Sequence, residues 1–355
     1  MAPSAQAVAE RRPAYLTELA QGTERFHEPR RTDCPWCGAA RLRTRLRTTD
    51  LFQGKPGTFV VDQCRSCGHS FQNPCLTPEG LDFYYRDFYD GLNGGSVESL
   101  FDVKSSGGRY RSSARALAAH LEPESWLDVG TSHGHFPAVA KEVLPYTAFD
   151  GLDMGESVEE GRRAGRIEEA HRGRLVDLAP GLEGRYDAMS MFHYLEHSLD
   201  PRQELKAAHR VLRPGGHLMI EVPDPESRFS SLLGKWWLPY FQPQHLHFIT
   251  LGNLRTELRA LGYTVVAVDR REPHQPVDLT AAYMMLASQL LPDEDAPWRT
   301  KAPTALKRGV RKAVMLASLP GAVACWLVDQ LISPLVRRSR FSNAYRVIAR
   351  RDPDA

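Results

Sequence analysis

The sequence predicts an α/β protein in which a mostly parallel sheet, with helices on both faces, follows a small cysteine-rich domain. Three observations support this fold class. From residue 126, apolar runs that end in Gly or Asp alternate with helical stretches, four of the six cysteines stand in two Cys-x-x-Cys pairs, and a length of 355 residues fits two or three domains. The apolar runs are WLDVG, TAFDGLDM, GRLVDL, YDAMSMF and GGHLMIEVP, followed by YTVVAVDRR at 263–271 and AYRVIARR at 344–351.

Composition and charge exclude several classes of protein. Hydrophobic residues make up 42% of the chain and charged residues 25%, which excludes wholesale disorder, a collagen-like chain and a protein with many membrane spans. The formal net charge of +2 argues against a protein built mainly to coat nucleic acid. The first residues, MAPSAQAVAERRPAYL, contain no apolar signal region, so we expect a cytoplasmic protein.

The N-terminal part of the chain is expected to form an arm followed by a ribbon. Residues 1–32 are polar and rich in arginine, and residues 33–75 hold the cysteine pairs. Within this ribbon, RLRTRLR at 41–47 and TFVVDQ at 58–63 are separated by glycine and proline, which predicts a β-hairpin. Arginine alternates along the first run. This pattern is typical of a solvated strand face, and a phosphate-binding stripe is the second interpretation.

The two cysteine pairs predict a metal site. Each Cys-x-x-Cys is followed by glycine, which allows a tight turn that directs two thiolates at one ion. The four ligands are Cys34, Cys37, Cys64 and Cys67. A tetrahedral set of four sulfurs suits Zn²⁺ and leaves no open position for a substrate, so the zinc is expected to be structural. A redox role is disfavoured because one pair would suffice, and Cys75 and Cys325 remain single thiols.

A turn rich in glycine follows the first strand of the predicted sheet. In Trp126–Phe136, a buried strand runs into Gly130-Thr-Ser-His-Gly134 and then into a helix. Glycine lets the backbone approach a ligand closely. Asp153 ends the next strand, where a carboxylate can accept both hydroxyls of a ribose, and Asp177 in LVDL is expected to end the third.

The order of these motifs resembles that of the class I S-adenosylmethionine-dependent methyltransferases. LDVGTSHGHF resembles their first motif, GLDMGES the second, LVDL the third, and YDAMSMFHYLEHSLDP with RVLRPGGHLMIEVP the fourth and fifth strands. The resemblance implies a Rossmann-like sheet of seven strands, with 121–271 and 343–355 as the cofactor-binding domain and AYRVIARR as the last, antiparallel strand.

The resemblance also implies a role for individual residues. Asp128, Gly130 and Gly134 would hold the methionine moiety and Asp153 the ribose, while Met154 and Leu178 would contact the faces of the adenine and Asp177 its amino group. The resemblance adds Ser132, Phe136 and Phe192 to the residues expected around the cofactor, although many members have glycine at the position of Ser132.

The same turn allows two other interpretations. NAD binding also uses an acidic residue after the second strand, but the spacing of Gly130 and Gly134 does not make G-x-G-x-x-G. A Rossmann-like domain without a cofactor is the second alternative.

The cysteine module and the aromatic segment after it resemble a subgroup of bacterial methyltransferases with an N-terminal zinc ribbon, which modify sugars, glycans and secondary metabolites. Residues 76–120 form the connector, and its first helix is expected to begin with Thr77 as N-cap and Pro78 in the first turn. The resemblance implies that this segment lies over the active site, with Tyr85 and Tyr89 as pocket residues. Packing of the aromatic stripe into the core is the alternative.

Three histidines stand where this fold places its substrate, beyond the carboxyl ends of the strands. His193 and His197 follow the fourth strand, and His245 lies in QPQHLHF after the fifth. Histidine suits a general base because its pKa lies near neutrality. Sugar C-methyltransferases of the subgroup have a Glu-His pair where this chain has Gln244-His245, which favours O-methylation with His245 or His197 as the base. Glu196 is expected to orient a histidine or a helix.

The function that these motifs favour is methyl transfer from S-adenosylmethionine to a small-molecule hydroxyl, on a sugar, a glycan or a secondary-metabolite intermediate. C-methylation of a sugar or natural product is the first alternative. An RNA methyltransferase that binds nucleic acid through the ribbon is the second, and the low net charge speaks against it. A partner subunit or scaffold that binds the cofactor without catalysis is the third. The sequence does not indicate the oligomeric state.

Residues 272–342 form an insertion before the last strand. It contains AVMLASLPGAVACWLV at 313–328, an uncharged run shorter than the ~20 residues of a membrane span and expected to break at Pro320-Gly321. A helical hairpin that serves as a lid is one interpretation. From Arg299 to Arg340 there are nine basic residues and one acidic residue, Asp329. Basic flanks around an apolar hairpin also suit a peripheral contact with a membrane or a lipid-linked acceptor.

Overall fold

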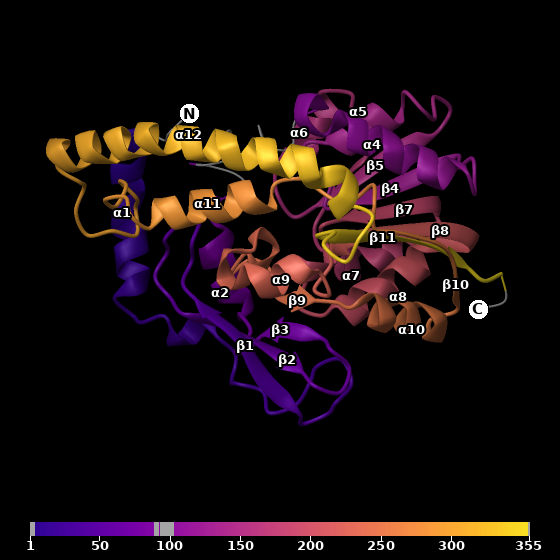
Figure 1. Ribbon diagram of the computed structural model, residues 1–355. Coiled ribbons are helices and arrows are strands. Elements are labelled where there is room, and N and C mark those ends of the chain that lie inside the picture. Colours follow the sequence, from indigo (N-terminus) through magenta and orange to yellow (C-terminus); the bar gives the residue numbers. More distant parts are fainter. Residues whose placement is uncertain (1–3, 89–91, 93–102, 354–355) are drawn as a thin grey trace. The chain divides into compact units, whose positions relative to one another are not determined.

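The computed structural model describes residues 4–88, 92 and 103–353. The chain divides into two compact units, whose elements Figure 1 labels. The first unit comprises Met1–Ser96, Pro225–Leu246 and Gln275–Asn343, and the second comprises Val97–Asp224, His247–His274 and Ala344–Ala355. The ribbon and most of the insertion, far apart in sequence, therefore belong to one unit. Residues 225–246, which the sequence assigns to the cofactor-binding domain, pack with this first unit.

The predicted hairpin is present in the first unit. Strand β1 (Leu42–Thr48) pairs antiparallel with β2 (Phe59–Cys64), which pairs antiparallel with β3 (Ser70–Gln72). The register of β1 shifts between Thr44 and Leu46, so the row of arginines is interrupted at Arg45. The Arg45 guanidinium instead donates to Ser231 Oγ at 2.7 Å. An uninterrupted phosphate-binding stripe is therefore not formed on this strand.

Helices supply most of the rest of the first unit. They are α1 (Ala5–Leu19), α2 (Pro78–Tyr85), α9 (Arg228–Leu232), α11 (Asp278–Ser288) and α12 (Ala305–Val336), with 3₁₀ turns at Glu24–Phe26, Gly234–Trp236 and Leu238–Tyr240. The predicted start of α2 is confirmed, because Thr77 Oγ1 accepts a hydrogen bond from the Gly80 amide at 3.1 Å. Tyr89 lies outside the described residues.

Helix α12 differs from the expectation of a break at Pro320-Gly321. It continues through both residues for 32 residues, and α11 packs beside it (Figure 1). A proline inside a helix costs about 3 kcal/mol, and contacts with α11 offset this cost. Gly321 leaves room for the ring of Tyr283, whose hydroxyl donates to Ser318 O at 3.1 Å. The helix is also long and apolar enough to cross a membrane by length and composition, so the expectation of a segment too short for this is wrong.

The second unit is built on the predicted seven-stranded sheet, in the order β10-β11-β8-β7-β4-β5-β6. The strands are β4 (Ser125–Val129), β5 (Ala148–Asp153), β6 (Ala170–Arg172), β7 (Tyr186–Phe192), β8 (Leu212–Pro223), β10 (Tyr263–Asp269) and β11 (Ala344–Arg351). Strands β4 to β8 are mutually parallel, whereas β11 runs antiparallel to both of its neighbours. The predicted last strand is confirmed residue for residue. A two-residue strand, β9 (His247–Phe248), precedes α10.

One predicted strand is wrong. LVDL forms the short helix α7 (Leu175–Leu178), and the third strand of the domain is β6, five residues earlier. A short apolar run has no periodicity that separates a strand from one helical turn. Asp177 therefore lies in a helical turn after the sheet edge and does not end a strand.

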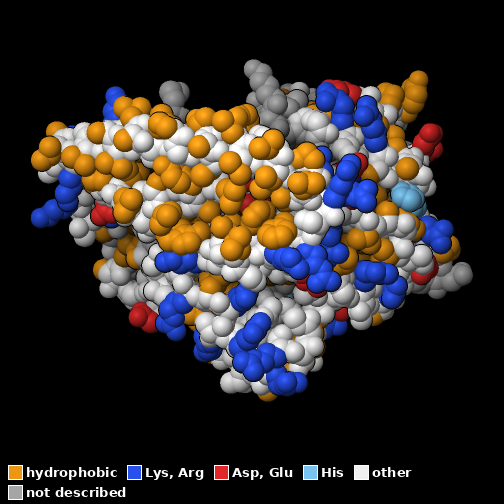
Figure 2. All heavy atoms as spheres, in the orientation of Figure 1, with side chains coloured by type: hydrophobic (Ala, Val, Ile, Leu, Met, Phe, Trp, Pro, Cys, Tyr) orange, Lys and Arg blue, Asp and Glu red, His pale blue; other side chains and the backbone are white. Residues whose placement is uncertain are grey.

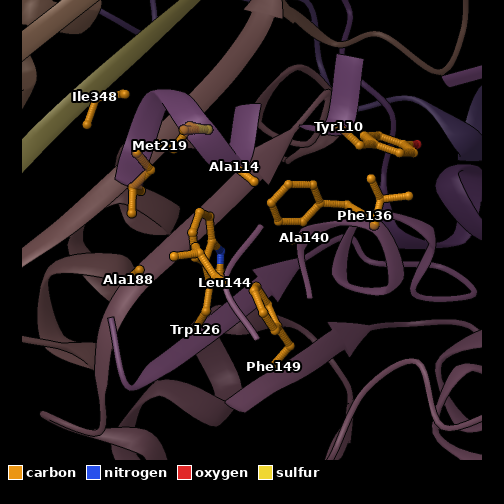
Figure 3. Packing of buried hydrophobic residues seen from close by; sticks show 12 residues of the cluster. Tyr110, Ala114, Trp126, Phe136, Ala140, Leu144, Phe149, Ala188, Met219 and Ile348 are labelled. Carbon is orange, nitrogen blue, oxygen red and sulfur yellow. The ribbon is translucent and has the colours of Figure 1, made fainter. Parts of the chain in front are cut away.

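Helices cover both faces of this sheet, with α4, α5 and α6 on one face and α8 and α10 on the other (Figure 1). Their bounds are α4 (Val103–Ala118), α5 (His135–Ala140), α6 (Ser157–Arg163), α8 (Pro201–Val211) and α10 (Leu251–Ala260), with 3₁₀ turns at Ala179–Leu182 and Leu195–His197. The core between α4, α5 and the sheet is dense in aromatic rings, as Figure 3 shows around Trp126, Phe136 and Phe149. It fixes the strand ends that carry the candidate site.

Candidate functional site

The glycine turn after β4 forms as predicted. Gly130 and Gly134 both adopt left-handed backbone conformations, with φ of 75° and 72°. The Gly130 amide donates to Leu152 O at 2.8 Å, which ties the turn to β5. A Cβ on Gly130 would lie 3.0 Å from the ring of Tyr194, so the turn also packs against the loop that follows β7. Both glycines are required by conformation, and Gly130 also by close approach.

Asp153 supports this turn from the end of β5. One carboxylate oxygen accepts from the Ser132 amide at 2.9 Å and the other from the Gly155 amide at 2.9 Å. Each carboxylate oxygen has two lone pairs, so each retains capacity to accept a hydroxyl. This arrangement fits the expected hydrogen bonds to two ribose hydroxyls. Ser132 itself has a φ of 49°, a conformation that glycine adopts more readily than serine.

Asp128 lies deeper, near the end of β4. Its side chain is buried and accepts a hydrogen bond from Ser190 Oγ at 2.6 Å, and Ser190 Oγ in turn accepts from the indole of Trp126 at 2.9 Å. Burial raises the pKa of Asp128 to about 7, against the opposing effect of the Ser190 hydrogen bond. Near neutral pH this carboxyl group therefore changes charge readily, and a nearby cation would favour its ionised form.

The three residues expected around adenine differ in how far they are exposed. Met154, directly after β5, is 66% exposed. Asp177 is exposed and pairs with Arg174 at 2.8 Å. Its hydrogen bond from Arg174 lowers the pKa of Asp177, so it is a surface carboxylate. Leu178 is half-buried and lies against Gly173, the residue that follows β6.

The two phenylalanines expected near the cofactor lie against each other. The ring centroids of Phe136 and Phe192 are 4.6 Å apart. Phe136 is buried in the core cluster beside Tyr110 and Trp126 (Figure 3), whereas Phe192 is partly buried at the end of β7. Phe136 therefore supports the glycine turn from within the core and does not line an open surface.

The loop after β7 brings a histidine and a glutamate together. His193 has a φ of 50°, and its Nδ1 lies 3.1 Å from Glu196 Oε1. Its Nε2 lies 3.3 Å from Arg109 Nη1 on α4. Glu196 is buried, so its carboxylate is held near the imidazole. The expectation that Glu196 orients a histidine is thus met at His193, which the sequence ranked below His197 and His245.

A buried charge network lies behind His193. The backbone amide of His193 donates to Glu221 O at 2.8 Å, and the Glu221 carboxylate accepts from Arg346 Nε at 2.7 Å and from Ser113 Oγ at 2.9 Å. Arg109 Nη1 lies 3.8 Å from the same carboxylate. Burial by itself would raise the pKa of Glu221. The positive charges of Arg346 and, more weakly, Arg109 outweigh burial, so the pKa of Glu221 is lowered. The carboxylate therefore stays charged and anchors Arg109.

The other two candidate histidines belong to different units of the chain. His197 closes the 3₁₀ turn Leu195–His197 in the second unit. His245 belongs to the first unit, where its Nδ1 lies 2.8 Å from Pro239 O. Gln244 is fully buried and accepts at its backbone oxygen from the Tyr85 hydroxyl at 3.1 Å. Tyr85 and Gln244 therefore serve the packing of the first unit.

The four cysteines of the ribbon converge. Their Sγ atoms all lie within 4.8 Å of one another, and two pairs, Cys34 with Cys67 and Cys37 with Cys64, are each 3.7 Å apart. Four sulfurs at the Zn–S bond length of about 2.3 Å would form a tetrahedron with edges of about 3.8 Å. Backbone amides of Trp36 and Ser66 point at Cys34 Sγ and Cys64 Sγ, each at 3.4 Å. This donor set fits Zn²⁺ in both chemistry and spacing.

Comparison with known families identifies part of the second unit. Residues 109–268 match the family model described as a methyltransferase domain. This segment is a methyltransferase domain. The sheet order of the second unit and the glycine turn after β4 are the framework of the class I methyltransferase fold that the sequence predicted.

Individual relatives resemble this methyltransferase domain over part of their length. An uncharacterized 37.1 kDa protein in transposon TN4556 of Streptomyces fradiae is 33% identical over 169 residues, 43% of this chain and 49% of that protein. A ubiquinone biosynthesis O-methyltransferase of Alkalilimnicola ehrlichii is 30% identical over 135 residues, 36% of this chain and 53% of that protein. The chain thus spans about half the length of these relatives.

Among solved structures, a SAM-dependent methyltransferase from Archaeoglobus fulgidus is similar with a TM-score of 0.44 and 18% identity, covering 71% of this chain and 99% of that chain.

Sequence reasoning missed the charged residues behind His193. Glu221 stands inside the apolar run GGHLMIEVP and Arg346 inside AYRVIARR, and a charge within a buried strand is a signal of a paired partner. Arg109 carried no such signal, because only the packing of α4 brings it to the end of β7.

Proposed function

We propose that this protein transfers a methyl group from S-adenosylmethionine to a hydroxyl of a small-molecule acceptor. The observation that carries this proposal lies at the carboxyl ends of two central strands in the sheet of the methyltransferase domain. Strands β4 and β7 are parallel neighbours, with Val129 opposite Met191, so the glycine turn and the His193–Glu196 pair follow adjacent strand ends. In sheets of this kind, ligands bind beyond the carboxyl ends of the strands.

The residues present fit the cofactor. Asp153 has lone pairs for the ribose hydroxyls, and the turn at Gly130 and Gly134 allows the backbone to approach the ligand. S-adenosylmethionine supplies an electrophilic methyl group on a sulfonium. The ionised Asp128 carboxylate would attract the positively charged end of S-adenosylmethionine. Asp177 is not part of this proposal, because it lies in α7 in an ion pair with Arg174.

His193 is the base that the geometry favours over His197 and His245. Glu196 accepts from Nδ1–H, which fixes the tautomer in which Nε2 is the basic nitrogen. An acceptor hydroxyl that takes the place of Arg109 beside Nε2 would transfer its proton there as its oxygen attacks the methyl group. The displaced Arg109 remains attracted to Glu221.

The acceptor class rests on resemblance and is part of the proposal. The curated relatives named for ubiquinone biosynthesis are O-methyltransferases, which supports a hydroxyl as the acceptor. A sugar, glycan or secondary-metabolite hydroxyl is proposed on the likeness of the ribbon. None of the six cysteines forms a disulfide, which supports a cytoplasmic location.

Isothermal titration with S-adenosylmethionine and S-adenosylhomocysteine tests the cofactor site. We expect both to bind, and we expect Asp153→Asn to lose at least tenfold in affinity because the amide presents donors to the ribose hydroxyls. Absence of binding by the folded wild-type protein would overturn the proposed function.

Transfer of a labelled methyl group to a panel of phenolic and sugar hydroxyls tests the base. His193→Gln should lower kcat by roughly 10²–10⁴-fold, the range for loss of a general base, while cofactor affinity stays unchanged. His120→Gln, on an exposed histidine after α4, is the matched control. If His193→Gln retains full activity, then His193 is not the base, and the same substitution at His197 and His245 decides between the remaining candidates.

The second part of the proposal is a structural Zn²⁺ held by Cys34, Cys37, Cys64 and Cys67. All four positions of a tetrahedral ion would be filled by sulfur, so the ion would stabilise the ribbon and take no part in methyl transfer.

A further inference from the structure

Helix α12 is amphipathic in the reverse of the usual sense. Its face toward α11 and the segment that follows α11 carries the polar contacts. Arg311 donates to Pro292 O at 2.8 Å, Ser318 O accepts from Tyr283, and Asp329 is buried against the first turn of α11. The large aliphatic side chains stand on the other side. A surface helix of a globular protein normally presents its polar face to water.

The outward face of α12 is apolar along most of its length. Leu306, Leu331 and Leu335 are 78%, 80% and 75% exposed. The other exposed large apolar residues of the helix are Val310, Met315, Leu316, Leu319, Val323, Trp326, Leu327 and Val328. Only 6% of the most apolar 18-residue window is buried. Figure 2 shows hydrophobic side chains gathered over this helix and continuing onto α11, where Met284 and Leu286 are also exposed. A contiguous patch of this kind marks an interaction surface.

Positive charge lies at both ends of the same helix. Lys307, Arg308 and Lys312 lie in its first turns and are exposed, and Arg337, Arg338 and Arg340 follow its last residue and are exposed too. Arg311, in contrast, pairs with Glu294 at 2.8 Å. Within residues 4–88, 92 and 103–353, no carboxylate lies within ion-pair distance of any of the six exposed cations. An apolar surface with unpaired cations at both ends complements a layer of acyl chains with anionic headgroups.

We propose that the outward face of α12 docks on an anionic membrane, with the helix lying in the plane of the interface. The exposed leucines would enter the boundary between headgroups and acyl chains, and the basic residues at both ends would contact lipid phosphates. This inference is independent of the proposed methyl transfer, because it uses only residues of α12 and its flanks.

The contacts with α11 favour this peripheral mode over a membrane span. Asp329 accepts from the amides of Leu279 and Thr280, at 3.1 and 2.9 Å, and from the Thr280 hydroxyl at 2.7 Å. A spanning α12 would have to leave α11 and carry Asp329 into hydrocarbon, which is costly. The interfacial mode keeps Asp329 buried where it is and covers only the face that is already exposed.

Charge also favours a membrane over a second copy of this chain. Two copies that paired through α12 would bring basic ends together in either orientation, because both ends of the helix are positive. Like charges placed opposite each other oppose association, whereas anionic lipid is attracted by both ends.

Co-sedimentation of the full chain with lipid vesicles tests the proposal. We expect binding to vesicles of phosphatidylcholine mixed with phosphatidylglycerol, and much weaker binding to phosphatidylcholine alone or in high salt. The triple variant Lys307→Gln, Arg308→Gln, Lys312→Gln should lose about a hundredfold in affinity, at about fivefold for each cation. The double variant Leu327→Glu, Leu331→Glu should lose at least about a hundredfold in affinity for the vesicles, because neither side chain could then be buried among the acyl chains.

Tyr146→Glu, at a large apolar side chain that is 97% exposed in the second unit, is the matched control and should bind vesicles normally. Circular dichroism and thermal melting of each variant check that it is folded. Equal binding to neutral and anionic vesicles, or unchanged binding of the leucine variant, would overturn the proposal. So would a dimer in sedimentation that the leucine variant dissociates without any vesicle binding, or wild-type protein that resists extraction from membranes at high pH, which indicates a span.

Discussion

The two units of the protein are stabilised in different ways. The second unit surrounds a core of aromatic and aliphatic side chains, and it pairs its buried charges with one another, as Arg346 pairs with Glu221 at 2.7 Å. The first unit buries charged groups in its interior and exposes the apolar face of α12. Lys55 is an example, since its buried Nζ donates to Phe83 O and Arg86 O, each at 2.7 Å. The comparison teaches that the second unit carries its stability within itself, whereas the first, by our proposals, also depends on a metal ion and a membrane.

The largest expected effect is on the stability of the first unit, when one of the four clustered cysteines is replaced. Cys64→Ser removes one of four sulfurs, and the binding free energy of a structural zinc, about 10–16 kcal/mol in small domains, is available to folding only while the ion is held. We expect the purified variant to lose zinc, measured by elemental mass spectrometry, and to unfold at much lower denaturant. Cys325→Ser, at a partly buried free thiol on α12, should retain both zinc and stability. A Cys64→Ser variant with unchanged stability would show that no ion supports the ribbon.

The matching test in the second unit removes an aromatic ring from its core. Phe136→Ala should cost about 3–5 kcal/mol of unfolding free energy, as expected for a buried phenylalanine. Tyr146→Ala, in the same unit but 97% exposed, should change it by less than about 0.5 kcal/mol. Urea denaturation measures both. Because the proposed metal would support only the first unit, chelation should not alter the difference between these two variants.

The sequence predicted the second unit far better than the first, for a physical reason. A strand buried in a parallel sheet is marked by its own residues, and AYRVIARR was predicted with its bounds intact. LVDL was assigned wrongly because one helical turn and a short strand have the same apolar content. In the first unit, the continuity of α12 through Pro320 depends on Tyr283 of another helix, which no local pattern reveals.

The candidate site was predicted in part for the same reason. The turn at Gly130 and the carboxylate of Asp153 are local features of strand ends, and both lie where the motif order placed them. The pairing of His193 with Glu196 needs only a spacing of three residues, so the sequence contained it. The approach of Arg109 requires the packing of α4 on the sheet and was beyond any sequence pattern.

A smaller effect tests the buried carboxylate of the first unit. Asp329→Ala leaves two amides and a hydroxyl of α11 without their acceptor, which should cost about 1–3 kcal/mol of unfolding free energy. Gln330→Ala is the adjacent control, since its side chain is exposed and makes one bond, to Pro276 O at 3.1 Å. Chemical denaturation compares the two variants. Equal losses would mean that polar contacts between α11 and α12 do not stabilise the first unit.

The buried Asp128 carboxylate of the second unit should make the affinity for S-adenosylmethionine depend on pH. Burial raises the pKa of Asp128 to about 7, and a positively charged cofactor favours the ionised form. Below about pH 7, binding must release a proton from Asp128, so the affinity for S-adenosylmethionine should fall by up to about tenfold per pH unit. Above about pH 7 the carboxylate is ionised and the affinity should level off. Titration calorimetry between pH 5 and 8, roughly one or two units on each side of this pKa, measures the profile. Asp128→Asn should bind more weakly and flatten it, and a wild-type affinity without this slope would contradict the assignment.

The smallest effect concerns the backbone of the glycine turn. Ser132 adopts a φ of 49°, which costs a residue with a Cβ about 1–2 kcal/mol, while glycine has a larger unfolded-state entropy worth about 0.5–1 kcal/mol. Ser132→Gly should therefore raise the unfolding free energy by up to about 1 kcal/mol. Ser132→Ala removes the same hydroxyl but keeps the strain, so it separates the two causes. Gly130→Ala should act in the opposite direction, because φ is 75° there and the new Cβ meets Tyr194 at 3.0 Å. If Ser132→Gly and Ser132→Ala have the same stability, then the hydroxyl and not the backbone sets the energy of this turn.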